Sequence, residues 1–93
     1  MAITLADTIT RNDDLMIAEI DGEVVLMHID LGNYYGLDEI GSDIWTRLDA
    51  PQGVAALRDA LIADYEGDAA QIEADLIELL DRMAEHDLVR VQG

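Results

Sequence analysis

Residues 15–29, LMIAEIDGEVVLMHI, decide how the first half of the chain folds. Two apolar-rich runs, Leu15–Ile20 and 23–29, flank the pair Asp21-Gly22, and both residues of this pair tolerate the positive φ that a two-residue hairpin turn needs. A second turn at 30–33 leads into a short run at 34–37. The pattern predicts a three-stranded antiparallel meander.

The segment before the hairpin gives a weaker signal. Ile3, Leu5 and Ile9 are consistent with a loose strand, but the polar run at 11–14, RNDD, interrupts it. We therefore expect residues 1–14 to be loose or disordered.

The second half has the periodicity of helices. Apolar residues at three- and four-residue spacing predict helices at 39–48, 54–65 and from 69 to about 86, with Asp38 and Asp68 as N-caps. Trp45 lies on the apolar side of the first helix, which favours a place in the core. A short closing strand or extended tail follows at 88–91. The predicted fold is a single α+β domain, 1–93, that is winged helix-turn-helix-like: a three-stranded antiparallel sheet followed by three helices.

Composition limits the partners of this domain. The 93 residues include 21 Asp and Glu against five Arg and no Lys, which gives a formal net charge of −16. Such a surface repels phosphates, so we expect neither nucleic acid nor an anionic membrane as partner, and a basic or neutral partner is favoured. The acidity also fits the simpler role of keeping a small domain soluble.

Few residues suit catalysis. Cysteine and lysine are absent, Ser42 is the only serine, and His28 and His86 lack a second histidine at metal-binding spacing. We expect no enzymatic activity, no cofactor and no metal. An acyl carrier protein would need an Asp-Ser-Leu-like attachment site on a helical bundle, and Gly41-Ser42-Asp43 has the wrong order. No membrane span or signal peptide is present in the sequence, so a cytoplasmic location is expected.

One stretch resembles a known family. Residues 32–45, GNYYGLDEIGSDIW, resemble the GxYYxLNxxGxxIW signature of the PqqD-like family, and the likeness continues through 54–57 (VAAL), 61–65 (LIADY) and 87–89 (DLV). It covers residues from about 15 to 91. Asp38, where Asn is common, and Asp87, where Gly is common, are conservative departures.

The resemblance implies a RiPP recognition element, a non-catalytic domain that binds the leader of a ribosomally made precursor peptide. The Tyr-Tyr-x-Leu and Ile-Trp forms are more similar to the stand-alone members of lasso-peptide clusters, whose partners would be a leader peptidase and an ATP-dependent macrocyclase. The alternatives are a PqqD-type peptide chaperone for a radical SAM maturase and a winged-helix regulatory or interaction domain.

The resemblance also implies where the leader binds: as an antiparallel strand on the third strand, in a cleft against the last helix. The expected leader-binding residues are Asn33, Tyr34, Tyr35, Gly36, Leu37, Ile72, Asp75, Leu76, Leu79 and Met83. Simpler roles stay open for several of them. Gly36 also suits a tight strand-to-helix junction, the apolar stripe of the last helix also suits a deeply packed core, and Asp75 is either a selector of basic leaders or a solvated carboxylate. One tyrosine of the pair should point inward, and the sequence does not say which.

Overall fold

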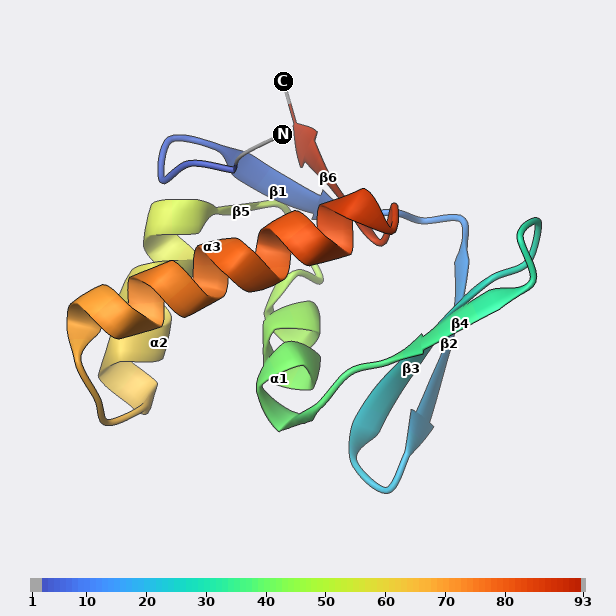
Figure 1. Cartoon of the computed structure of the whole chain (residues 1–93), viewed down its shortest axis with the longest axis horizontal. Coiled ribbons are helices and arrows are strands. Elements are labelled where there is room, and N and C mark those ends of the chain that lie inside the picture. The colour runs from blue at the N-terminus through green and yellow to red at the C-terminus, as the bar shows by residue number, and fades with distance from the viewer. Residues whose placement is uncertain (1–2, 93) are drawn as a thin grey trace.

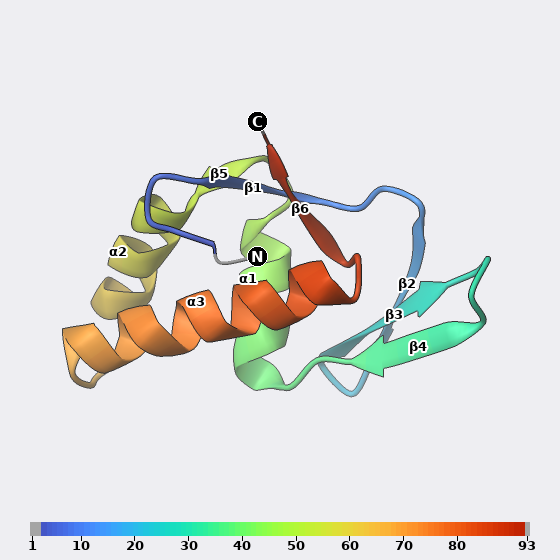
Figure 2. The same cartoon turned by 45° about the horizontal axis from the view of Figure 1, so that its top comes forward.

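The computed structural model describes residues 3–92, which form two small sheets and three helices (Figures 1 and 2). The predicted hairpin is present: β2 (Leu15–Ile20) pairs with β3 (Glu23–His28), and β3 pairs with β4 (Asn33–Gly36), all antiparallel. Asp21 and Gly22 adopt φ values of 53° and 83°, as a two-residue hairpin turn requires. The sheet stands to one side of the helices and joins them through the end of β4.

The segment before the hairpin differs from the prediction of a loose segment. Thr8–Arg11 forms β1, which lies between β5 (Gln52–Gly53) and β6 (Val89–Gln92) in a second antiparallel sheet. The cause is burial, because the side chains of Ile3 and Ile9 are 3% and 0% exposed. Residues 1–2 of this predicted segment lie outside the described part of the chain.

The three predicted helices are present with their caps. They are α1 (Glu39–Arg47), α2 (Val54–Asp64) and α3 (Ala69–Glu85). The Asp38 carboxylate accepts a hydrogen bond from the Gly41 N–H at 2.8 Å, and Asp68 does the same for Ala70 at 3.0 Å. These bonds satisfy backbone donors that the first helical turn leaves free.

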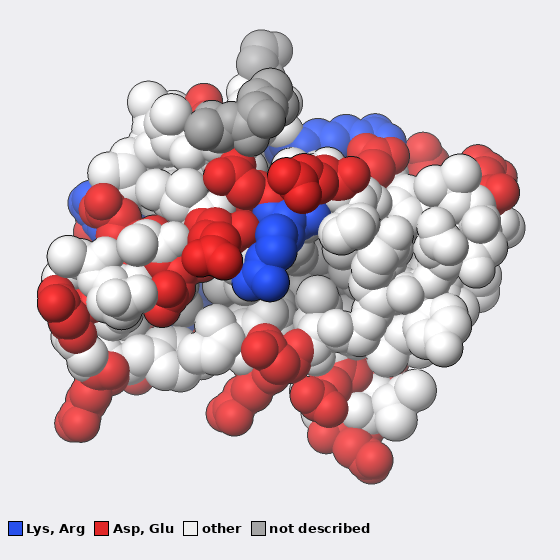
Figure 3. Space-filling model, viewed as in Figure 1, with Lys and Arg blue, Asp and Glu red and all other residues white. Residues whose placement is uncertain are grey.

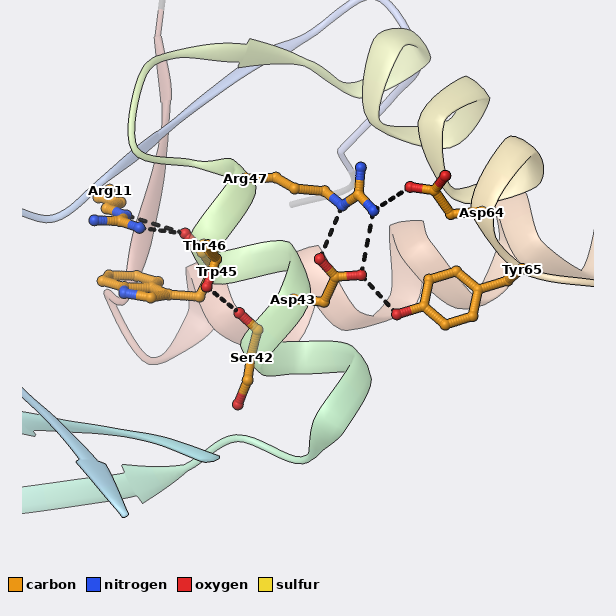
Figure 4. Close-up of polar contacts among 8 residues, drawn as sticks. All are labelled: Arg11, Ser42, Asp43, Trp45, Thr46, Arg47, Asp64 and Tyr65. Atoms are coloured by element: carbon orange, nitrogen blue, oxygen red, sulfur yellow. Dashed lines mark hydrogen bonds and ion pairs between the residues drawn. The ribbon is translucent and has the colours of Figure 1, made fainter. Parts of the chain in front are cut away.

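One core joins the two sheets and the helices. Its fully buried side chains come from both sheets, from each of the three helices and from the C-cap of α1: Ile9, Leu26, Ile44, Leu48, Val54, Leu76, Leu80 and Val89. Trp45 is 2% exposed, which confirms its predicted place in the core. The Arg11 guanidinium lies 4.6 Å from the Trp45 ring centre and donates to the Trp45 carbonyl, so it ties β1 to α1 (Figure 4).

The α+β class, with a three-stranded antiparallel sheet followed by three helices, is therefore confirmed, and the second sheet is an addition to it. Within residues 3–92, no helix combines the length and the apolar character needed to cross a bilayer.

Candidate functional site

The outer edge of β4 is open. In its sheet the strand order is β2-β3-β4, and β4 has no partner strand on its other side among the described residues. The segment before the hairpin, which could have covered this edge, pairs elsewhere, since β1 is taken by β5 and β6. The edge is thus available to another extended chain.

The hydrogen-bond pattern identifies which backbone groups face outward. The Leu37 N–H donates to the Val24 carbonyl at 2.8 Å. Residues of an antiparallel strand alternate between facing their partner and facing away, so Tyr35 also faces β3, in register with Leu26. Tyr34 and Gly36 then direct their N–H and C=O groups away from β3. Two residues with two groups each present four unpaired backbone groups at this edge.

A cleft of about 300 Å³ lies between this edge and α3. It is lined by Tyr35, Gly36, Leu37, Asp38, Gly41, Leu79, Arg82, Met83, His86 and Leu88. Tyr35 is the tyrosine that points inward, half-buried, with its ring centre 4.8 Å from that of His86, whereas Tyr34 is 74% exposed on the other face of the sheet. An extended chain on β4 would place alternate side chains in this cleft.

His86, which lines the cleft, is held in place by β3 and β4. His28 is buried, and its Nε2–H donates to the His86 carbonyl at 2.8 Å, which ties β3 to the C-terminal end of α3. The Tyr35 ring packs edge-on against His28, with ring centres 6.4 Å apart. These contacts hold the inner wall of the cleft in place.

The junction between β4 and α1 also lines the cleft. The Ser42 hydroxyl accepts from the Val24 N–H at 2.9 Å and donates to the Leu37 carbonyl at 3.1 Å. Gly41 packs tightly, because an added Cβ would lie 3.2 Å from Asp38 Oδ1 and 3.3 Å from the Leu37 Cβ. The signature glycine, Gly41, and the Ser42 that follows it therefore fix where the strand ends.

A polar cluster holds α1 against α2 behind the site (Figure 4). The Asp43 carboxylate accepts from the Tyr65 hydroxyl at 2.6 Å and from Arg47 at 3.0 Å, and Arg47 also pairs with Asp64. The Tyr65 hydroxyl, with a further contribution from Arg47, holds the pKa of Asp43 below its ordinary value of 3.8. The cluster is structural, since it lies outside the cleft.

The structure distributes the ten expected site residues over three surfaces. The cleft between β4 and α3 contains Tyr35, Gly36, Leu37, Leu79 and Met83. Ile72, Asp75 and Leu76 instead line a pocket of about 270 Å³ between α1, α2 and α3, to which Leu79 also contributes. Asn33 and Tyr34 line a shallow pocket on the outer face of the sheet. Of the helix residues, Leu76 and Met83 are each only 2% exposed and contribute to the core.

The sequence analysis missed five residues of the cleft: Asp38, Gly41, Arg82, His86 and Leu88. Arg82 and His86 lie three and seven residues after Leu79, a spacing that places all three on one side of a helix. That spacing is the signal in the sequence that could have identified them.

Ser42, the only serine, is engaged within the fold. Both hydrogen-bonding directions of the Ser42 hydroxyl are used within the fold, and its side chain is buried. No group of three or more potential ligands is placed to hold a metal ion within residues 3–92.

Known proteins share this sequence and fold. The family described as coenzyme PQQ synthesis protein D (PqqD) matches residues 23–89. A "PqqA binding protein" of Xanthomonas euvesicatoria pv. vesicatoria (strain 85-10) is 40% identical over 55 residues, which are 59% of this chain and 60% of the relative. One from Xanthomonas oryzae pv. oryzae (strain PXO99A) is 38% identical over the same shares. The chain thus spans about 60% of the length of these relatives.

A solved structure is similar over almost the whole chain. It is described as TbiB1 in complex with the TbiA(beta) leader peptide, and it has a TM-score of 0.79 and 37% identity over 90% of this chain and 95% of that chain. Together with the family match over residues 23–89, this likeness confirms the resemblance drawn from residues 32–45: the chain belongs to the PqqD family.

Proposed function

We propose that this chain is a non-catalytic RiPP recognition element, which binds the leader of a precursor peptide as an added strand on β4. The observation that carries the proposal is the combination of an open strand edge and an adjoining cleft against α3. Main-chain hydrogen bonds at such an edge supply affinity for any extended chain, and the cleft supplies selectivity for alternate side chains. Relatives named for binding PqqA, and a similar protein solved with a leader peptide, support the same activity.

The affinity expected from this geometry is moderate. Four ladder hydrogen bonds contribute about 0.5–1.5 kcal/mol each, and two apolar side chains in the cleft add about 1.5–3 kcal/mol each. Ordering the peptide opposes this by about 1–2 kcal/mol per residue. With about four residues ordered, these terms leave at most about 8 kcal/mol, so a micromolar dissociation constant is the upper limit of the expected affinity.

Hydrogen exchange tests the added strand directly. The amides of Tyr34 and Gly36 face outward and should exchange quickly in the free protein. They should become protected when the leader of a precursor encoded beside this gene is added. The outward amides of β2, at the opposite edge of the same sheet, serve as the internal control because β3 separates them from β4 and its cleft. Protection that appears at β2 and not at β4 would reject the proposed site.

We further propose that the bound leader is presented to a separate leader peptidase and an ATP-dependent macrocyclase in lasso-peptide biosynthesis. The Tyr34-Tyr35 and Ile44-Trp45 forms of the signature support this assignment. The second candidate is a peptide chaperone for a radical SAM maturase, which the match to the PqqD family favours. The neighbouring reading frames discriminate between them, because a peptidase and a cyclase support the first and a radical SAM enzyme supports the second.

A winged-helix regulatory role is the remaining alternative, and the charge opposes it. Exposed acids on α3, with Asp75 and Glu78 among them, would face the phosphates of a duplex, and acidic side chains dominate the face drawn in Figure 3. Titration of labelled duplex DNA at low salt should give no binding.

A further inference from the structure

Arg82 is the one arginine whose guanidinium has no partner among the described residues. The other four are engaged within the fold: Arg11 by the Trp45 carbonyl, Arg47 by Asp43 and Asp64, Arg58 by Asp59 and Glu73, and Arg90 by Asp87. In a chain with a formal net charge of −16, an unpaired cation is unusual.

Its neighbours on the helix make the lack of a partner more informative. Glu78 and Glu85 lie four residues before and three residues after Arg82, at spacings that allow ion pairs on one helix face. No such pair forms in the described part of the chain, and Arg82 instead lines the cleft beside β4. Figure 3 shows basic atoms near the centre of this face with acidic side chains around them.

The direction of β4 relative to α3 locates Arg82 along a bound peptide. Tyr35 packs on His86 near the C-terminal end of α3. In Figures 1 and 2, β4 approaches that end of the helix and the chain then continues toward α1, opposite to the direction of α3. The strand therefore runs antiparallel to the helix. A peptide added antiparallel to β4 would run parallel to α3, with the side chains opposite Tyr35 and Leu37 directed toward the helix. Arg82 lies between Leu79 and His86 in the sequence of α3 and so is reached from this face of the peptide.

We propose that Arg82 makes this cleft selective for a peptide with an Asp or Glu side chain two residues from an apolar anchor, both on the face turned toward α3. The apolar anchor packs on Leu79 and Met83, and the carboxylate accepts hydrogen bonds from the guanidinium. Residues two apart share one face of a strand, which sets this spacing. The inference rests on the proposed function, since it assumes an added strand at β4.

The net charge of −16 by itself favours a basic peptide, which is the opposite of the preference proposed for Arg82. The strengths of these two electrostatic effects decide which peptide binds. At physiological ionic strength, however, charges separated by more than about 8 Å are largely screened, so the acids that oppose a carboxylate in the cleft are mainly the near ones: Asp38, which lines it, and Glu78 and Glu85 beside Arg82. A direct guanidinium–carboxylate contact acts within hydrogen-bonding distance and forms the charge-assisted, two-pronged type of bond. The local contact should therefore dominate selection.

Selection of peptides from a random display library tests the inference, because it needs no identified ligand. The bait is the full chain, as wild type, as Arg82→Glu and as Arg58→Glu. The last variant makes the same charge change on α2, outside the cleft, where Arg58 and its partner Glu73 are partly exposed and its other partner, Asp59, is exposed. Wild type and Arg58→Glu should enrich peptides with Asp or Glu two residues from an apolar residue, and Arg82→Glu should enrich Lys or Arg at that place while the apolar residue is kept.

A double-mutant cycle then measures the contact. Replacing the selected acidic residue of the peptide by Gln should weaken binding to wild type about threefold to tenfold, and should have no effect on binding to Arg82→Gln. Three outcomes would overturn the role of Arg82 and leave the proposed function intact. Wild type could select apolar anchors with no acidic preference, or it could select basic residues. The acidic preference could also be lost equally in Arg82→Glu and Arg58→Glu. Peptides that bind Gly36→Pro as tightly as wild type would instead overturn the added strand itself.

Discussion

Gly36→Pro should weaken peptide binding and leave the fold intact. The Gly36 N–H points away from β3 and has no partner in the free protein, so the missing N–H of proline removes nothing from the native sheet. Gly36 has no positive φ, and an added Cβ would meet no atom within 4 Å, so the position accepts a side chain. The substitution therefore acts on the bound state.

The magnitude follows from one lost ladder bond. A net contribution of about 0.5–1.5 kcal/mol corresponds to a Kd increase of about 2-fold to 13-fold. The proline ring at the edge adds a steric cost, because it occupies the space into which the added strand must come. The free energy of unfolding should change by no more than about 1 kcal/mol, since proline also restricts the unfolded chain.

Fluorescence anisotropy with a labelled peptide from the selection measures the effect. Gly36→Ala is the matched control, since its methyl group lies on the outer face and its N–H is kept, and its Kd should stay within about twofold of wild type. Tyr35→Pro is the opposite control: it removes an N–H that faces β3, so its thermal unfolding midpoint should fall. Equal Kd values for Gly36→Pro and Gly36→Ala, whether both unchanged or both raised, would refute the role of the Gly36 N–H.

Three further substitutions test the support of the site. Asp43→Asn should lower stability at neutral pH, because the fold holds the pKa of Asp43 below 3.8, chiefly through the Tyr65 hydroxyl. This stabilisation is present above pH 3.8 and is lost as the pH falls through the depressed pKa. The free energies of urea unfolding of the two proteins should therefore converge in acid, and a difference that stays constant with pH would contradict the assignment. Ser42→Ala leaves the Val24 N–H without its acceptor and should cost about 1–3 kcal/mol by chemical denaturation, whereas a neutral result would mean that the two strands close up directly. Leu76→Ala should cost about 2–5 kcal/mol, as expected of a side chain that is 2% exposed; a small loss of stability with a large loss of peptide binding would instead make Leu76 a contact residue.

The elements that local sequence determines were predictable. The hairpin turn at Asp21-Gly22 and the caps at Asp38 and Asp68 depend on residues close to them in the chain, and each was predicted at its observed place. The second sheet depends on distant pairing, since Thr8 faces Gln92 and the strand β5 has only two residues. No local pattern reports that kind of pairing, because it is decided by the burial of Ile9 in a core built from the whole chain.

The site was predictable on the strand side and less so on the helix side. A meander leaves its first and third strands at its edges, and the resemblance to the PqqD-like family selected the third, which is β4. The periodicity of α3 gives a stripe, but the stripe is wide enough to serve the core, the cleft and a second pocket. Leu76 therefore belongs to the core, and Asp75 lies by the second pocket with its carboxylate accepting from Gln71. Only the packing of α1 against α3 separates these surfaces.

The signature residue Gly41 and its neighbour Ser42 explain why the edge stays open. Val24 and Leu37 lie opposite each other, one residue beyond Val25 and Gly36, the last pair in the register of β3 and β4. Two backbone hydrogen bonds could join them, and the one from the Leu37 N–H to the Val24 carbonyl is present. In place of the second bond, from the Val24 N–H to the Leu37 carbonyl, the Ser42 hydroxyl accepts from the Val24 N–H and donates to the Leu37 carbonyl. The first turn of α1 is therefore hydrogen-bonded to both strands. A larger residue than Gly41 would push that turn away, because its Cβ would meet the Leu37 side chain. With this junction fixed, the chain turns into the helix directly after Gly36 and cannot fold back along β4, so the strand's outer backbone groups are left for another chain.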